Sequence, residues 1–225
     1  MSPFPGLALA AAAFVGTHFA LSHPLRAPLV ARLGEKGFMA VYALVAFATL
    51  GLTSHAYGPA KAAAPAPMWD AGGAGWWLAT ALMWLAAVLF TGSLRGNPAL
   101  PGMAPDTFPP PRGVFRITRH PMNWAFAIWA FVHALVVATP AAVIVSLAIA
   151  TLALVGSLLQ DRKKEALLGD KWTGWEARTS LVPFARGFAL PDGFALVVGT
   201  ILWLAITWAH GALGYQRAGI FHFFG

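Results

Sequence analysis

Histidines carry the clearest chemical signal in this sequence, and His133 has the most unusual surroundings. It lies in the run RITRHPMNWAFAIWAFVHAL (residues 116–135), thirteen residues after His120 and among tryptophan, phenylalanine and valine. In a helix this spacing corresponds to about 20 Å of travel, so the imidazole lies too deep in the apolar run to reach water. Burying it without a partner would cost a few kcal/mol, which leaves either a hydrogen bond between helices or a bound metal.

The residue types around His133 narrow the kind of metal. The chain has no cysteine and no HExxH zinc pattern, and no aspartate or glutamate stands near His133. This argues against zinc, hard cations and carboxylate-bridged metals. A neutral imidazole in an apolar, aromatic-lined helix bundle suits a haem held by histidine. Basic residues at the His120 end of the run could pair with the haem propionates; they are Arg112, Arg116 and Arg119.

The other histidines differ in their position along the apolar runs. His18 lies about one turn before the end of the first run, where its ring could bond to a backbone carbonyl or hold a ligand. His55 and His210 fall within about a turn of the outer ends of their runs, where water can reach them. His23 and His222 are expected to be solvated or to lie at the lipid headgroups.

Helices in a membrane must position these side chains. The sequence is 58% hydrophobic and only 10% charged, with a mean hydropathy of +0.66, which is unlike a soluble domain. Its apolar runs approach the roughly 20 residues that a membrane-crossing helix needs, and the alternation typical of a barrel is absent. We therefore predict an all-α integral membrane protein, a single domain over residues 1–225. Its six transmembrane helices are expected at residues 3–21, 38–57, 73–92, 120–138, 140–160 and 191–213.

The basic residues predict the orientation. Thirteen of the 15 follow the first, third or fifth predicted span, and only Lys61 and Arg217 lie elsewhere. Because Lys and Arg resist translocation, we expect the three basic loops in the cytoplasm and both termini on the periplasmic side of a bacterial inner membrane. The net charge of +7 then reflects topology, and it does not indicate a nucleic-acid partner.

The connections between spans also carry information. Residues 97–113 are rich in proline and glycine and should form a semi-rigid cytoplasmic loop. The link at Thr139 and Pro140 is so short that the fourth and fifth spans should form an antiparallel hairpin. Residues 161–184 are charged but keep apolar and aromatic positions at helical spacing, so this segment should lie against the cytoplasmic face of the bundle.

Four motifs together resemble one family of membrane proteins. They are a first-span histidine followed by S-x-P-L-R, then GEKGFMAVYALVAFATL, ITRHPMNWAFAIWAFVH and DRKKEALLGDKWTGWEARTSLVPF. The combination resembles the NnrU family across nearly the whole chain, and that family is similar to plant and cyanobacterial 15-cis-zeta-carotene isomerase. The most specific portion of the match includes both His120 and His133.

The resemblance implies a haem b that acts when its iron is reduced and releases an axial ligand, so that iron can assist rotation about a polyene double bond. Carried over by motif, the axial ligands would be His18 and His133. The other cofactor contacts that the motif implies are Arg119, His120, Asn123 and Trp124. NnrU members are also associated with nitrite and nitric oxide reduction in bacteria.

Depth in the membrane gives a second criterion for choosing the two axial histidines. At about 1.5 Å per residue, His18 should lie about 6 Å and His133 about 20 Å from the cytoplasmic boundary. This pair suits one haem only if the haem plane lies closer to parallel with the membrane, or if the spans tilt or shift. By depth alone His55 matches His133 better, so His55 is the replacement candidate.

A second resemblance belongs to another functional class. RHP followed about forty residues later by E-x-L-x-G-x-x-W-x-x-W is similar to the isoprenylcysteine carboxyl methyltransferases. It implies S-adenosylmethionine at the cytoplasmic face, held by Arg119, His120 and Glu165. Glu165 could equally belong to a salt-bridged helix face with neighbouring basic residues. The chain departs from those enzymes where they carry tyrosines, at Asn123, Trp172 and Trp175.

Three hypotheses about function follow. The first is a haem-b membrane protein that isomerises a polyene or serves nitrogen-oxide metabolism, and the second is the methyltransferase. The third is a non-enzymatic scaffold or haem-handling subunit of a reductase complex. The expected partners are the lipid bilayer, a hydrophobic small molecule such as a polyene, and either a second copy of the chain or a reductase complex.

Overall fold

The computed structural model describes residues 2–100 and 108–224, and within these ranges the chain is helical and has no β-strand. Each of the six predicted spans coincides with an α-helix. The predicted loop at residues 97–113 falls partly outside the described ranges. The α-helices are α1 (Phe4–Ser22), α2 (Arg26–Ala63), α3 (Gly72–Ser93), α4 (Pro121–Val137), α5 (Pro140–Leu168), α6 (Asp170–Glu176) and α7 (Gly193–Ala212).

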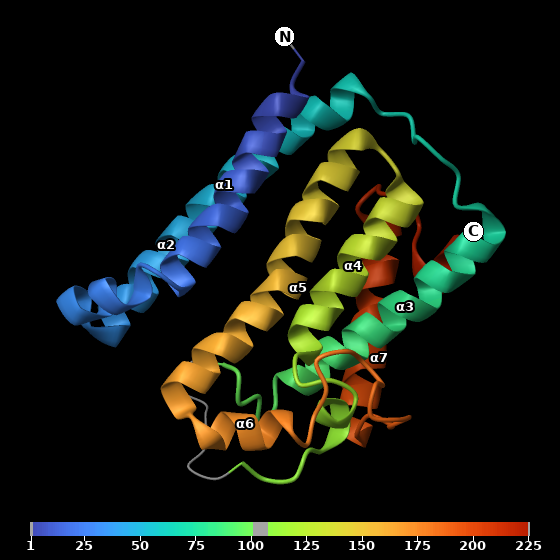
Figure 1. Ribbon diagram of the computed structural model, residues 1–225. Helices are drawn as coiled ribbons and strands as arrows, with labels where there is room; N and C mark the ends of the chain where they lie inside the picture. Colours follow the sequence, from blue (N-terminus) through green and yellow to red (C-terminus); the bar gives the residue numbers. More distant parts are fainter. Residues whose placement is uncertain (1, 101–107, 225) are drawn as a thin grey trace.

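The long helices form a bundle in which α5 lies between two groups (Figure 1). On one side of α5, α1 packs against α2, and on the other side α4 packs against α3, which in turn packs against α7. α4 and α5 form the predicted antiparallel hairpin. Thr139 caps α5 by accepting a hydrogen bond from the amide of Ala142, and Pro140 occupies the first turn, where its missing N–H costs nothing.

Helix length and surface character indicate a multi-pass membrane protein. α1, α2, α3, α5 and α7 are each long and apolar enough to cross a membrane. The remaining predicted span, α4, is an apolar helix of 17 residues, which at about 1.5 Å per residue is still close to the thickness of the hydrocarbon core. Large apolar side chains face outward, such as Phe47 at 73% exposure, as lipid contact requires.

Two helices extend beyond the predicted spans. α2 begins at Arg26 and not at residue 38, and it is interrupted at Gly34, whose φ of 69° only glycine adopts easily. α5 continues past residue 160 to Leu168, because Arg, Lys and Glu favour helices and no breaker occurs before Gly169. The predicted charged segment at residues 161–184 is therefore divided between the end of α5, the short helix α6 and the turns that follow it.

The chain after α7 folds back onto α3. Its short 3-10 turn η2 (Gly219–His222) contacts α3. Trp76 of α3 stacks on His222 with ring centroids 3.8 Å apart, and Trp77 stacks on Phe223 at 3.9 Å. This return segment, residues 213–224, contributes Tyr215, Gln216, Ala218 and Gly219 to the lining of the cavity described below.

Candidate functional site

A cavity lies among α3, α4, α7 and the return segment, with further lining residues from α2 and α5. It has a volume of about 710 Å³, within the range of small-molecule sites. Most of its walls are apolar or aromatic, with contributions from Trp76, Met83, Phe90, Phe126, Trp129 and Ile206. Two of these side chains, Phe126 and Ile206, are also 45% and 47% exposed on the outside of the bundle. The cavity is therefore bounded by side chains that would contact lipid.

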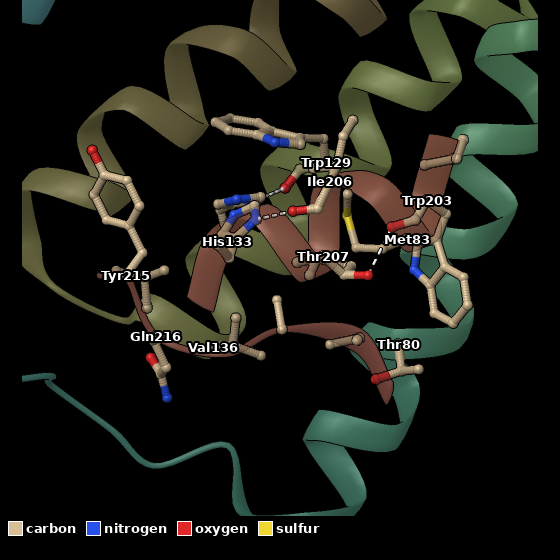
Figure 2. A pocket seen from close by; sticks show the side chains of 18 of the residues that line it. Thr80, Met83, Trp129, His133, Val136, Trp203, Ile206, Thr207, Tyr215 and Gln216 are labelled. Atoms are coloured by element: carbon tan, nitrogen blue, oxygen red, sulfur yellow. Dashed lines mark hydrogen bonds between the residues drawn. The ribbon is translucent and has the colours of Figure 1, made fainter. Parts of the chain in front are cut away.

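Two imidazoles line this cavity, His133 from α4 and His210 from α7. Nδ1–H of His133 donates to the carbonyl oxygen of Trp129 at 2.8 Å, and Nδ1–H of His210 donates to that of Ile206 at 2.7 Å. Figure 2 shows the His133 ring and its hydrogen bond to Trp129 at the cavity wall. The indole of Trp129 stacks on the His133 ring with centroids 3.9 Å apart, which fixes the ring plane.

Further polar groups line the cavity deeper along α3 and α7. The hydroxyl of Thr80 and the indole nitrogen of Trp203 are buried, and within the described residues neither has a hydrogen-bond partner. Figure 2 shows both side chains at the cavity wall. Lys61 of α2 also lines the cavity. An unpaired buried donor costs about 1–3 kcal/mol, so these groups favour a ligand or water that satisfies them.

The structure does not bring His18 and His133 together. The His18 ring packs edge-on against Phe14 and against Tyr42 of α2, at centroid distances of 4.4 and 5.5 Å. His18 belongs to α1, which lies with α2 on one side of α5, whereas His133 belongs to α4, which lies on the other side of α5 (Figure 1). The replacement candidate, His55, is exposed on α2 and does not line the cavity.

The predicted cofactor contacts Arg119 and His120 form a separate buried cluster around Asp161 of α5. The Arg119 guanidinium donates to one carboxylate oxygen of Asp161 at 2.8 and 2.6 Å, and His120 Nε2 lies 2.7 Å from the other. Arg119 also pairs with Glu176 of α6 at 3.3 Å. Arg119 and His120 bind protein partners and do not line the cavity, which differs from the prediction that they contact the same cofactor as His133.

Asn123 and Trp124 also tie α4 to its neighbours and do not line the cavity. The Asn123 side chain donates to the Ser157 hydroxyl of α5 at 2.9 Å, and the Trp124 indole donates to the carbonyl of Leu181 at 2.8 Å. The RHP motif therefore joins the ends of α4, α5 and α6. The contacts with Asp161 engage Nε and one terminal nitrogen of Arg119 and Nε2 of His120, two of the residues that the second resemblance assigned to S-adenosylmethionine.

The Asp161 cluster predicts that the stability of the folded protein depends on pH, because Glu176 titrates there. Burial, the negative charge of Asp161 and a hydrogen bond with Glu165 raise the pKa of Glu176 to about 7, from an ordinary value of 4.5, against the opposing charge of Arg119. Between these two values the folded protein holds a proton that the unfolded chain has released, so stability should fall as pH rises. We expect thermal stability in detergent to be lower at about pH 8 than at about pH 5, and Glu176→Gln to flatten this slope.

Glu35→Gln serves as a control for the Glu176 measurement, because Glu35 is exposed and pairs with Arg26 on the surface. This control should keep the slope of the unmodified protein. A Glu176→Gln protein with an unchanged slope would show that another group titrates.

His210 was not among the candidate ligands predicted from the sequence. The depth argument that selected His55 applies equally to His210, because His133 and His210 each precede the end of a helix, Val137 and Ala212, by about one turn or less. The missing information was the arrangement of the helices in space, which places His210 of α7 and not His55 of α2 on the cavity that His133 lines.

Comparison with known proteins adds two findings. The model of a family described as NnrU protein matches residues 6–217. The chain is also similar to the chloroplastic 15-cis-zeta-carotene isomerase of Arabidopsis thaliana, with 31% identity over 99 residues, which is 42% of this chain and 27% of the relative. The match thus spans about a quarter of that relative's length. No solved structure matches the chain.

Proposed function

This chain belongs to the NnrU family of membrane proteins, and on that premise we propose that it binds haem b in the cavity at His133 and serves the isomerisation of a polyene. The observation that carries the proposal is the pair of anchored imidazoles on the wall of a large apolar cavity. The match over residues 6–217 confirms the family resemblance carried by the motifs.

The residues present fit a haem at His133. Because a carbonyl oxygen can only accept, the hydrogen bond to Trp129 fixes the His133 proton on Nδ1 and leaves the lone pair of Nε2 available to a metal. The apolar walls suit a macrocycle, and Lys61 would hold a propionate in place of the arginines first considered. Bound and reduced haem would supply an iron that assists rotation about a polyene double bond.

The cavity walls also suit the proposed substrate. Since Phe126 and Ile206 both line the cavity and face outward, a lipid-dissolved molecule can approach from the membrane without crossing water. The aromatic lining excludes water, which protects a reactive polyene. The proposal places the chain in a bacterial inner membrane with both termini in the periplasm, as the basic residues predict.

The test is an absorption spectrum of the detergent-purified protein, oxidised and then reduced with dithionite. We expect a Soret band that is lost or strongly reduced in His133→Ala, because the ring supplies an iron ligand. His55→Ala is the matched control, because it removes an exposed histidine outside the cavity, and it should leave the spectrum unchanged. A protein that stays colourless after haem supplementation contradicts the proposal.

Isomerase activity is tested separately from haem binding. Reduced protein is incubated in detergent with a cis-polyene such as a cis-carotene, and the isomers are separated by chromatography. Conversion by the reduced and not the oxidised protein supports a redox-gated isomerase. A haem-loaded protein that converts none of the substrate supports a haem-handling role instead.

A further inference from the structure

We propose that His210 is the second imidazole of the His133 site, so that one cofactor is held between α4 and α7. This inference rests on the proposed function and deepens it, because it replaces His18 in the pair that the family motif implies. It starts from the shared cavity: His133 and His210 both line it, although they are far apart in sequence and belong to different helices.

Both rings make the same kind of hydrogen bond, and this bond suits each of them to bind a metal. Each Nδ1–H donates to a carbonyl oxygen four residues earlier, and in both neutral rings the lone pair is then on Nε2. Metal-binding histidines almost always donate their other ring N–H in this way, which fixes both tautomer and orientation. Within the described residues, no protein group is hydrogen-bonded to Nε2 of either ring.

The placement of α4 and α7 favours a ligand between the two rings. Both helices pack along α3, and the cavity occupies the space between them. Cofactor sites in helix bundles are built in this way, from side chains on facing helices. Trp129 stacks on His133, and the backbone amide of Tyr215 donates to the carbonyl of His210 at 2.9 Å, which holds the end of α7 in place.

A comparison with His18 shows which of these features distinguishes His210 as a candidate ligand. Its Nδ1–H also donates to a carbonyl four residues earlier, that of Phe14 at 2.7 Å, so an anchored ring alone does not distinguish a ligand. What separates His210 from His18 is the cavity, which His210 lines and His18 does not. His18→Ala is therefore a matched control, since it removes an anchored, half-buried helix histidine from the other side of α5.

The experiment compares reduced and oxidised spectra of His210→Ala, His133→Ala and His18→Ala with those of the unmodified protein. If His210 is the second ligand, His210→Ala loses the sharp reduced alpha and beta bands of a bis-histidine haem, and His18→Ala keeps them. Free imidazole added to His210→Gly should restore those bands, which a merely misfolded variant could not do.

The possible outcomes distinguish the assignment of His210 as the second ligand from the proposal that the protein binds haem. A spectrum altered in His18→Ala and unchanged in His210→Ala overturns the assignment of His210 but leaves haem binding intact. An unmodified protein that binds no haem overturns both proposals. Loss of the bands in His210→Gly without rescue by imidazole, together with a lowered melting temperature, also counts against a ligand role, because His210 would then only support the fold.

Discussion

Replacing Asp161 by alanine is expected to destabilise the protein by about 3–5 kcal/mol, because it breaks the buried ion pair with Arg119 and removes the partner of the buried His120 ring. The Asp161 side chain is 7% exposed, and the side chains of Arg119 and His120 that it binds are 13% and 1% exposed. No other carboxylate among the described residues lies within ion-pair distance of His120. Removing Asp161 therefore leaves the buried His120 ring without a partner for Nε2, and leaves Arg119 with Glu176 as its remaining ion-pair partner.

The measurement is unfolding in detergent micelles, followed by helical circular dichroism or by tryptophan fluorescence. Asp161→Asn keeps an acceptor oxygen and loses the charge, so its destabilisation should fall between those of the unmodified protein and Asp161→Ala. Glu35→Ala is the control, because it breaks a pair in which Glu35 is 60% exposed, worth at most about 1 kcal/mol. Equal effects of Asp161→Ala and Glu35→Ala would contradict the idea that burial makes the Asp161 cluster important.

The helices could be predicted from the sequence because membrane spans depend on local composition. Length and hydropathy identified all six apolar helices, and the hairpin followed from the short link at Thr139. The ends were harder to predict. The first part of α2, residues 26–33, is a short charged helix whose continuity depends on Gly34 and on packing against α1.

The candidate site could be predicted only in part. The sequence predicted a deeply buried His133, whereas the structure has it half-buried about one turn before the end of α4. Its neighbours depend on how the helices pack in space, and spacing along the chain does not encode this. The same limit applies to Arg119 and Asp161, which are 42 residues apart. One signal was present, because Asp161 directly follows the predicted fifth span, where a carboxylate needs a partner.

The RHP motif illustrates how a specific sequence can serve structure. Two independent resemblances suggested that this motif and the residues just after it contact a cofactor. In the structure the side chains concerned instead bond to α5, to α6 or to the segment after α6; they are those of Arg119, His120, Asn123 and Trp124. By tying α4 to these elements the motif fixes the rotation of α4 about its axis. That rotation decides whether His133, three to four turns further along, faces the cavity.

Gly199 gives the second large expected effect, because α3 and α7 approach closely there. A Cβ at this position would lie 2.7 Å from the Cα of Val88 and 2.9 Å from the hydroxyl oxygen of Thr91. The first of these atoms is backbone and cannot turn aside, so the helices must separate. Small residues permit such contacts between membrane helices, and we expect Gly199→Ala to cost about 1–3 kcal/mol.

Gly51→Ala is the matched control, because Gly51 is also a helical glycine but a Cβ there meets nothing within 4 Å. It should stabilise α2 slightly, by about 0.5–1 kcal/mol, since alanine loses less backbone entropy in a helix than glycine does. The two substitutions are chemically identical and should have opposite signs in the same unfolding assay. If both stabilise the protein, α3 and α7 are not in close contact at Gly199.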